Sequence, residues 1–516
     1  MEAAEAVELE VVKKLEKPYD TILNRRTQEQ IVALCGAVGS GTTDIAKKIS
    51  DCFSRYSYEV KSVKASDLLI EAIATLEDTG QVEKGKFKYK DWGSEEERIK
   101  CLQDIGDWLR LKYGSDAAAQ LFIKKVSAFR QKDITEKEVA AGQLRRESKP
   151  LVWILDSLKH PEEVKLLRLV YDKMFSLFGV LCTFDVRKNI MVDVHGMTPE
   201  HAEQVLKRDE SEDISHGQKL IKTLQYGDFF IRNSPFTTQR VVDSIERYVK
   251  LLLGDHSVTP THGEYAMYLA QSAAYRSGCM SRQVGAAVLN THGEIISTGF
   301  NDVPRYGGGL YVENSQKDAR CFKVARGECR NEFRKGVIKK KLKELLSKKY
   351  PETEVDAELI PLISDETGIS DLTEYCRAVH AEMDAITSAA RKGFSLRSGT
   401  MYVTTFPCHN CAKHIIASGM KKVFYIEPYE KSLALSMHND SVSTTEETTE
   451  AVLFLPFEGV APRQYQNRFC TTTTKKVDGK FVAINVGKDT PAYSQLLDCF
   501  TDYEGKIVDT LAKNGL

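Results

Sequence analysis

Residues 401–411 read MYVTTFPCHNC, an apolar strand that runs through a proline into two cysteines three positions apart. At the start of a helix, Cys408 and Cys411 point the same way, and the helix N-terminus favours their thiolate forms. Together with His380 they offer one imidazole and two thiolates, which leaves one of the four zinc positions open for water. The stretch therefore predicts a catalytic zinc site, one Zn2+ per subunit, with His380, Cys408 and Cys411 as ligands.

An acidic residue, Glu382, follows His380 by two positions, and the order H-x-E then P-C-x-x-C is the pattern of zinc-dependent deaminases. We predict that Glu382 is catalytic. It takes a proton from the water that attacks C4 of cytosine, passes it to ring N3 and later protonates the departing amine. The alternative is a structural zinc knuckle built from Cys408, Cys411 and two other ligands. A knuckle gives no role to Glu382, which favours the deaminase.

On these motifs, residues from about 260 to 435 resemble the deoxycytidylate deaminase family. Residues 281–286 (SRQVGA) and residues 297–301 (STGFN) carry the resemblance further. It implies a cytidine-deaminase fold, an α/β/α domain, which we expect over residues 255–516 with an insertion at about 302–375. By the same resemblance, the long insertion favours a nucleotide deaminase over the compact nucleoside or tRNA-adenosine deaminases.

The resemblance also implies residues that contact the substrate. Asn301 would hydrogen-bond the deoxyribose, the backbone around Ala381 would contact the base edge, and Tyr429 would stack on the base or sugar. A tyrosine after a strand is more often a half-buried core residue, so that alternative stays open for Tyr429. A guanidinium binds phosphate oxygens bidentately, with solvated surface arginines as the alternative. The arginines that are candidates for phosphate are Arg282, Arg305 and Arg377.

Four further cysteines lie around the expected insertion. Some members of the family carry a second, structural zinc ion on cysteines of these segments, so the resemblance raises a second Zn2+ here. Free buried thiols are the alternative, because the spacing of Cys321 and Cys329 is not that of a standard knuckle. The four are Cys279, Cys321, Cys329 and Cys376.

A second region begins with residues 30–34, an apolar run typical of a buried strand, followed by the glycine loop 36–43 (GAVGSGTT) and a helical pattern to about residue 56. Strand, glycine loop and helix open a parallel α/β domain. The later apolar runs that fit strands of the same sheet are 151–155, 180–184 and 229–231. Behind a charged leader, residues 1–28, we therefore expect a P-loop nucleotide-kinase-like domain with a parallel sheet over residues 29–254.

The glycine loop would match a Walker A loop if Thr42 were lysine. Such a loop wraps phosphates with backbone N–H groups, and its lysine neutralises charge on the β- and γ-phosphates. Without that lysine phosphoryl transfer is disfavoured, so we predict a degenerate domain that holds a regulatory nucleotide with Mg2+. Purely structural glycines are the alternative. The predicted nucleotide-binding residues are Gly36, Gly39, Ser40, Gly41, Thr42, Thr43 and Asp156, with 207–210 (KRDE) as a candidate lid.

Composition limits the classes of partner and compartment. The chain has 516 residues, and 72 Lys+Arg against 73 Asp+Glu give a net charge of −1, which excludes a global basic field for DNA. No apolar run approaches the roughly 20 residues of a membrane helix, and residues 1–17 lack the apolar block of a signal peptide. Twelve cysteines are too sparse for a disulfide scaffold. We expect a cytoplasmic protein with reduced thiols and no membrane partner.

Taken whole, the arrangement resembles the bacterial anti-phage deoxycytidylate deaminases, which join a P-loop kinase-like domain to a deaminase domain. The resemblance implies deamination of dCTP and dCMP, which depletes cytosine deoxynucleotides as antiviral defence. It also implies a homo-oligomer restrained by a small inhibitory RNA. Two alternatives stay open. One is a housekeeping dCMP deaminase that supplies dUMP and carries a regulatory nucleotide-binding domain. The other is a polynucleotide-binding editing or sensor protein.

Overall fold

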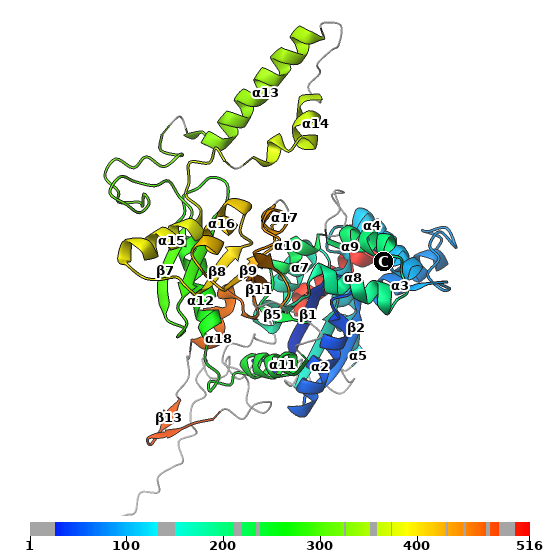
Figure 1. The fold of residues 1–516 in the computed structure, drawn as a ribbon. Coiled ribbons are helices and arrows are strands. Elements are labelled where there is room, and N and C mark those ends of the chain that lie inside the picture. The colour runs from blue at the N-terminus through cyan, green and yellow to red at the C-terminus, as the bar shows by residue number, and fades with distance from the viewer. Residues whose placement is uncertain are drawn as a thin grey trace, which may run out of the picture.

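The computed structural model describes residues 26–132, 150–210, 219–233, 238–324, 327–350, 359–372, 374–429, 432–446, 450–470, 475–483 and 501–515. Residues 1–25 of the expected leader lie outside the described residues. The described chain forms two six-stranded sheets covered by helices, and a small two-stranded sheet (Figure 1). The predicted mixed α/β fold with parallel sheets is confirmed.

The first sheet has the strand order β12-β5-β4-β1-β3-β2. Its parallel strands are β1 (Gln30–Gly36), β2 (Glu59–Lys64), β3 (Leu151–Asp156), β4 (Phe175–Leu181) and β5 (Phe229–Arg232). The strands expected at 30–34, 151–155 and 229–231 are confirmed. The strand expected at 180–184 is misplaced, because the buried run already starts at Phe175 and Thr183 takes the N-cap position of the next helix.

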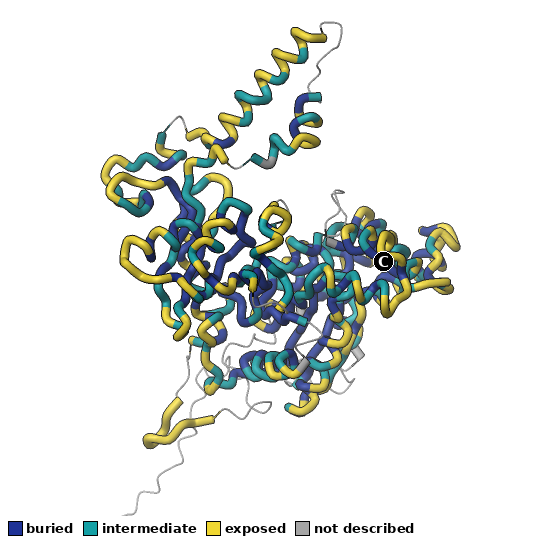
Figure 2. Tube along the Cα trace, viewed as in Figure 1, coloured by how far each residue is buried: buried dark blue, intermediate teal, exposed yellow. Residues whose placement is uncertain are grey.

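Side chains of β1 alternate between two apolar clusters, one on each face of this sheet. Ile31, Ala33 and Cys35 pack on one face, and Val32 and Leu34 on the other. The first face is covered by α3 (Ala65–Asp78), α5 (Ala117–Lys132) and α7 (Pro161–Tyr171), and the second by α2 (Thr42–Arg55) and α11 (Thr238–Leu252). The sheet is buried on both faces, as Figure 2 shows, which is why its strands are near-continuous apolar runs.

Further helices stand at the carboxyl edge of the first sheet and around it. They are α4 (Glu95–Tyr113), η1 (Asp172–Met174), α8 (Phe184–Asp193), α9 (Pro199–Glu210) and α10 (Leu220–Leu224). In Figure 1, α4, α8 and α9 lie together at the far side of the molecule from the second sheet. None of the described helices is long and apolar enough to cross a membrane.

The second sheet has the order β10-β11-β9-β8-β6-β7. The hairpin of β6 (Gly285–Leu289) and β7 (Ile295–Phe300) joins antiparallel to a parallel set. That set comprises β8 (Thr400–Thr405), β9 (Lys422–Glu427), β10 (Val442–Ser443) and β11 (Val452–Pro456). One face packs against α12 (His262–Ala274), and the other against α15 (Ala381–Lys392) and α16 (His409–Ala417). This α/β/α layering is a deaminase-type fold.

Two glycines let helices lie directly on the hairpin of the second sheet. A Cβ at Gly285 would stand 1.8 Å from the carbonyl oxygen of Ala270 in α12, and one at Gly299 would stand 2.2 Å from that of Ala381 in α15. Real Cβ atoms do not approach backbone this closely. The two missing side chains therefore fix how near both helices come to the sheet.

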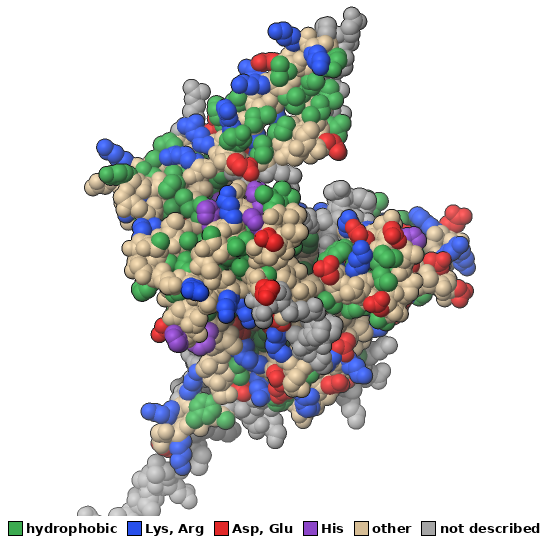
Figure 3. All heavy atoms as spheres, viewed as in Figure 1, with side chains coloured by type: hydrophobic (Ala, Val, Ile, Leu, Met, Phe, Trp, Pro, Cys, Tyr) green, Lys and Arg blue, Asp and Glu red, His purple; other side chains and the backbone are tan. Residues whose placement is uncertain are grey.

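A helical arm projects between β7 and α15, within the region expected as an insertion. It consists of α13 (Arg330–Lys349), α14 (Leu359–Glu366) and η3 (Ile369–Asp371), and in Figure 1 α13 points away from the body. Lys340, Lys341 and Lys343 are exposed, and Figure 3 shows basic side chains along α13. The remaining short elements are α17 (Ala434–Met437), η4 (Pro462–Gln464), α18 (Tyr465–Phe469), β13 (Lys476–Val477) and β14 (Lys480–Phe481).

Residues near the C-terminal end of the chain pack against the first sheet and connect it to the part of the chain that forms the second sheet. The short strand β12 (Gly459–Val460) pairs antiparallel with β5, and α19 (Thr501–Lys513) packs on α5. Buried Asp228, just before β5, accepts hydrogen bonds from Arg168 at 2.9 Å and from Arg463 at 2.6 Å. The two expected domains, 29–254 and 255–516, therefore share a sheet edge and a buried ion pair, and the exact boundary at 254/255 stays a prediction.

Candidate active site

The predicted ligands stand at the first residues of two neighbouring helices. His380 is the N-cap of α15 and Cys408 the N-cap of α16, and Cys411 lies in the first turn of α16. Strand β8 ends at Thr405 and leads directly into this turn through Pro407. Both helix N-termini carry partial positive charge, which favours thiolates at this point.

The three ligand atoms face one another. His380 Nδ1 lies 3.4 Å from the Sγ of Cys408 and 3.4 Å from that of Cys411. Bond lengths of about 2.0 and 2.3 Å to nitrogen and sulfur in a tetrahedral zinc site place such atoms about 3.5 Å apart. Cys408 is 7% exposed and Cys411 fully buried. The donor set and its spacing therefore fit Zn2+, and among the described residues no other group of three such ligands was found.

The thiols and the imidazole are coupled through hydrogen bonds. A hydrogen bond with Cys411 lowers the pKa of Cys408 to about 4, while the same bond and burial raise the pKa of Cys411. Hydrogen bonds with Cys376 and then Cys408 raise the pKa of His380 to about 11. The side chains of Cys376, His380, Cys408 and Cys411 thus form one hydrogen-bonded cluster.

Glu382 lies in the first turn of α15 and is 4% exposed. Burial raises the pKa of its carboxyl. A cavity of about 200 Å³ opens onto Glu382 and onto the ligand residues His380 and Cys408, while Cys411 lies buried beside them. The proposed general base Glu382 and the ligands His380 and Cys408 therefore face one small cavity of a size that suits a nucleobase.

Residues predicted to contact substrate meet at the same cavity. Its wall includes Asn301, Ala381, Arg282 and Tyr429. Asn301 Oδ1 accepts a hydrogen bond from the backbone N–H of Val284 at 2.7 Å, and its Nδ2 donates to the carbonyl of Arg282 at 2.8 Å. An amide has two N–H donors and two lone pairs, so one of each remains for a ligand.

The comparisons with known proteins match the same part of the chain. Residues 260–427 match the family model of the cytidine and deoxycytidylate deaminase zinc-binding region. Over 166 residues the chain is 33% identical to the deoxycytidylate deaminase of Enterobacteria phage T2, a match that covers 32% of this chain and 80% of that protein.

The chain belongs to the deoxycytidylate deaminase family. A second relative, the deoxycytidylate deaminase of Mus musculus, is 26% identical over 206 residues, which cover 40% of this chain and 80% of the relative. The expectation of an enzyme, a hydrolase that acts on cytosine nucleotides, is confirmed at the level of the family. The matched zinc-binding region and the group of His380, Cys408 and Cys411 together indicate Zn2+ as the cofactor.

Two of the three arginines predicted to bind phosphate are not part of the wall of the deaminase cavity. Arg282 is in its wall, whereas Arg305 donates to the carbonyl of Gly308 at 3.1 Å and Arg377 to that of Ala319 at 2.9 Å. Both of those side chains are exposed, as in the surface alternative. Arg282 therefore remains the phosphate candidate of the deaminase.

Sequence reasoning missed one polar residue of the deaminase cavity. Asn331, in the first turn of α13, lines the cavity and is 9% exposed. Its Nδ2 donates to the carbonyl of Leu372 at 3.0 Å, but its buried Oδ1 has no hydrogen-bond partner among the described residues. The arm thus brings an acceptor to the site from within the expected insertion, and no sequence motif marks it.

Two of the four additional cysteines are in the wall of the deaminase cavity. Cys279 and Cys376 line the deaminase cavity, and Cys376 hydrogen-bonds His380. Burial raises the pKa of Cys321, and the nearby Cys329 and Cys279 raise it slightly more. Their ligand atoms do not form a group of three within 4.8 Å in the described part of the chain. A second zinc ion stays a prediction.

The glycine loop of the first sheet lies between β1 and α2, over a cavity of about 470 Å³. Thr43 Oγ1 donates to Asp156 Oδ2 at 2.7 Å, and Thr42 Oγ1 lies 3.2 Å from Ser157 Oγ. Gly39 and Gly41 have φ values of 78° and 80°, which favour glycine. The predicted residues that line the cavity are Gly36, Gly39, Gly41, Thr42, Thr43 and Asp156, while Ser40 is buried behind them.

Proposed function

We propose that this chain hydrolyses the C4–N bond of deoxycytidine nucleotides, so that dCMP and water give dUMP and ammonia, and dCTP gives dUTP likewise. The observation that carries the proposal is the placement of Glu382, His380 and Cys408 in the wall of one cavity, with the Sγ of Cys411 3.4 Å from His380 Nδ1. Relatives named deoxycytidylate deaminase support dCMP as a substrate. The additional use of dCTP rests on the resemblance to the two-domain anti-phage enzymes.

His380, Cys408 and Cys411 would hold Zn2+, which when bound acts as a Lewis acid and lowers the pKa of a water molecule towards neutrality. Glu382 takes one proton from the water that attacks C4 and donates it to ring N3. It then takes the remaining proton of the new C4 hydroxyl and delivers it to the amine, so that the C4–N bond breaks, ammonia leaves and C4 becomes a carbonyl. Because Glu382 is 4% exposed, these proton transfers are shielded from bulk water. The carboxylate carries protons and does not bind metal.

Four residues of the cavity wall would hold the nucleotide. The remaining N–H and lone pair of Asn301 contact the deoxyribose, and the backbone at Ala381, which is fully buried, contacts the base edge. The half-buried ring of Tyr429 stacks on the base or sugar. Arg282, exposed at the cavity, pairs with phosphate.

In the cell, we propose that this activity depletes cytosine deoxynucleotides as a defence against phage, in a homo-oligomer restrained by a small RNA. The glycine-loop region would be a degenerate P-loop kinase-like domain that senses a nucleotide with Mg2+, with Thr43 and Asp156 at the cation. Measuring nucleotide pools during infection tests this role. Unchanged dCTP and dCMP in cells that carry the protein would favour the housekeeping alternative.

The deciding experiment is ammonia release from a panel of dCMP, dCTP, CMP, CTP and deoxycytidine, with Glu382→Gln as the matched variant. We expect turnover of the two deoxynucleotides, and a loss of about 10²- to 10⁴-fold in the variant, the range of general acid–base catalysis. Zinc content should be unchanged in Glu382→Gln. Zinc-loaded protein that releases no ammonia from any of the five would overturn the proposal.

A further inference from the structure

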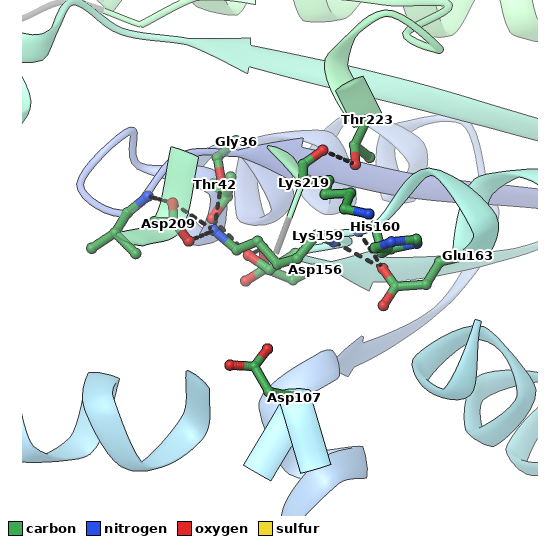
Figure 4. A network of polar contacts seen from close by, with 12 residues as sticks. Gly36, Thr42, Asp107, Asp156, Lys159, His160, Glu163, Asp209, Lys219 and Thr223 are labelled. Carbon is green, nitrogen blue, oxygen red and sulfur yellow. Dashed lines mark hydrogen bonds and ion pairs between the residues drawn. The ribbon is translucent and has the colours of Figure 1, made fainter. Parts of the chain in front are cut away.

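The glycine-loop cavity holds a cation that the sequence motif lacks. Lys159, three residues beyond the end of β3, reaches across to the loop. Its Nζ lies 2.9 Å from the carbonyl oxygen of Gly36 and 2.8 Å from Asp209 Oδ1 (Figure 4). The ammonium group of Lys159 thus lies beside the glycine loop, which has Thr42 where a Walker A loop has its lysine.

A carboxylate already occupies the anion-binding side of this loop. Asp209, at the end of α9, is fully buried, and its Oδ2 accepts the backbone N–H of Val38 at 2.6 Å while both oxygens pair with Lys159. A backbone N–H of a glycine loop and a lysine are the groups that such a loop offers to a phosphate oxygen. Asp209 therefore sits where a phosphate would bind, and residues 207–210, the candidate lid, form the end of α9.

An unpartnered amide faces the same cavity. Gln103, on α4, lines it and is 3% exposed, yet neither its Oε1 nor its Nε2 has a hydrogen-bond partner among the described residues. A buried amide without partners is costly unless a ligand satisfies it. Its donor and acceptor lie side by side, which suits the edge of a nucleobase.

We propose that this cavity binds a nucleoside 5′-triphosphate whose phosphate displaces the Asp209 carboxylate, with Lys159 in place of the absent loop lysine and Gln103 on the base. The inference rests on the proposed regulatory nucleotide site. It adds Lys159 as the cation of that site and the Asp209 carboxylate as a group that competes with phosphate. Displacement exchanges one anion for another at Lys159 and at the N–H of Val38, so neither is left unpaired. The site is thus closed by its own side chain until a nucleotide of sufficient affinity arrives.

The test is the affinity of the full-length, zinc-loaded chain for ATP, dTTP, dCTP and inorganic triphosphate with Mg2+, measured by calorimetry. Asp209→Asn should bind the nucleotide at least tenfold more tightly than the wild type, because the amide is a poor competitor for Lys159. Lys159→Met should bind at least tenfold more weakly. Lys165→Met is the matched control, since Lys165 is an exposed lysine paired with Glu162 outside the cavity, and its affinity should stay within twofold.

Each outcome separates the two proposals. If the wild type binds nucleotide but Asp209→Asn binds no more tightly, the built-in competitor is overturned and the nucleotide site stands. If Lys159→Met binds like the wild type, the substitute lysine is overturned. If neither the wild type nor Asp209→Asn binds any of the four, the nucleotide site itself fails. Equal affinity for inorganic triphosphate and nucleotides would overturn the role of Gln103. Should Asp209→Asn lose its fold, as judged by circular dichroism, Asp209→Ser provides the same comparison.

Discussion

The deaminase cavity and the glycine-loop cavity are both built where a strand ends and a helix begins, but their polar groups are arranged in opposite ways. In the first, His380, Cys408 and Cys411 aim their donor atoms at one another across 3.4 Å, and the helix starts hold them there. In the second, the loop N–H of Val38 and the ammonium of Lys159 are already satisfied by Asp209. The first arrangement suits a resident ion, and the second is what we expect if Asp209 occupies the place of the anion proposed to bind there.

Removing one ligand should give the largest effect and separates the two cavities most clearly. We expect Cys411→Ser to lose zinc and at least about 10³-fold in deamination, because a hydroxyl is a far weaker zinc ligand than a thiolate and Cys411 is fully buried. Elemental analysis and ammonia release measure both losses. Exposed Cys470 provides the control Cys470→Ser, which should keep zinc and activity. Full zinc content in Cys411→Ser would show that the ligand set is wrong.

The joint between the two regions should be the next most sensitive place. Asp228→Ala leaves Arg168, Arg463 and the buried backbone N–H of Leu177 without their shared carboxylate. Because both arginines keep partial contact with solvent, the main loss is that of the buried hydrogen bonds, about 1–3 kcal/mol. Chemical denaturation should show a lower free energy of unfolding with both regions melting together. If only one of two separate transitions moves, the regions fold independently and the joint is weaker than its contacts suggest.

Helix placement in the deaminase region can be tested through a single methyl group. Gly299→Ala puts a Cβ 2.2 Å from the carbonyl of Ala381 and should destabilise the fold by about 1–3 kcal/mol. It should also lower deamination, because α15 begins one residue after the ligand His380. Gly336, in α13, has open space around its Cβ position, so Gly336→Ala should leave the deaminase unchanged and slightly stabilise the helix. Equal behaviour of the two variants would exclude the close approach.

The glycine-loop region should respond to acid through His160, which lies beside that cavity at the N-cap of α7. Burial, and then the positive charges of Arg110 and Lys219, lower the pKa of His160 to about 4. An unfolded histidine titrates near 6.5, so the unfolded chain takes up more protons as the pH falls and stability drops below that value. Between pH 7.5 and 6 the loss should be about 1 kcal/mol by denaturation. His160→Gln should remove that part of the pH dependence, and an unchanged slope would contradict the assignment.

Sequence patterns predicted the deaminase site far better than the glycine-loop site. His380, Glu382, Cys408 and Cys411 lie in two short segments, and local helix starts are enough to place them, so spacing alone was informative. Lys159 and Asp209 are 50 residues apart and meet only because β3 and α9 come together at the loop. Asn331 reaches the deaminase cavity through the arm for the same reason. Contacts that depend on tertiary packing leave no periodic signal in the chain.

The pairing of β12 with β5 affects any attempt to produce the N-terminal and C-terminal parts of this protein as separate fragments. Residues 459 and 460, which follow the deaminase motifs, cover the outer edge of the first sheet beside β5. A fragment cut after residue 254 would bare that edge, and open strand edges attract foreign strands. The C-terminal half therefore cannot be replaced without affecting the sheet of the N-terminal half. A functional chimera with another deaminase would need the strand Gly459–Val460 as well as the catalytic segments, so that β5 keeps its partner.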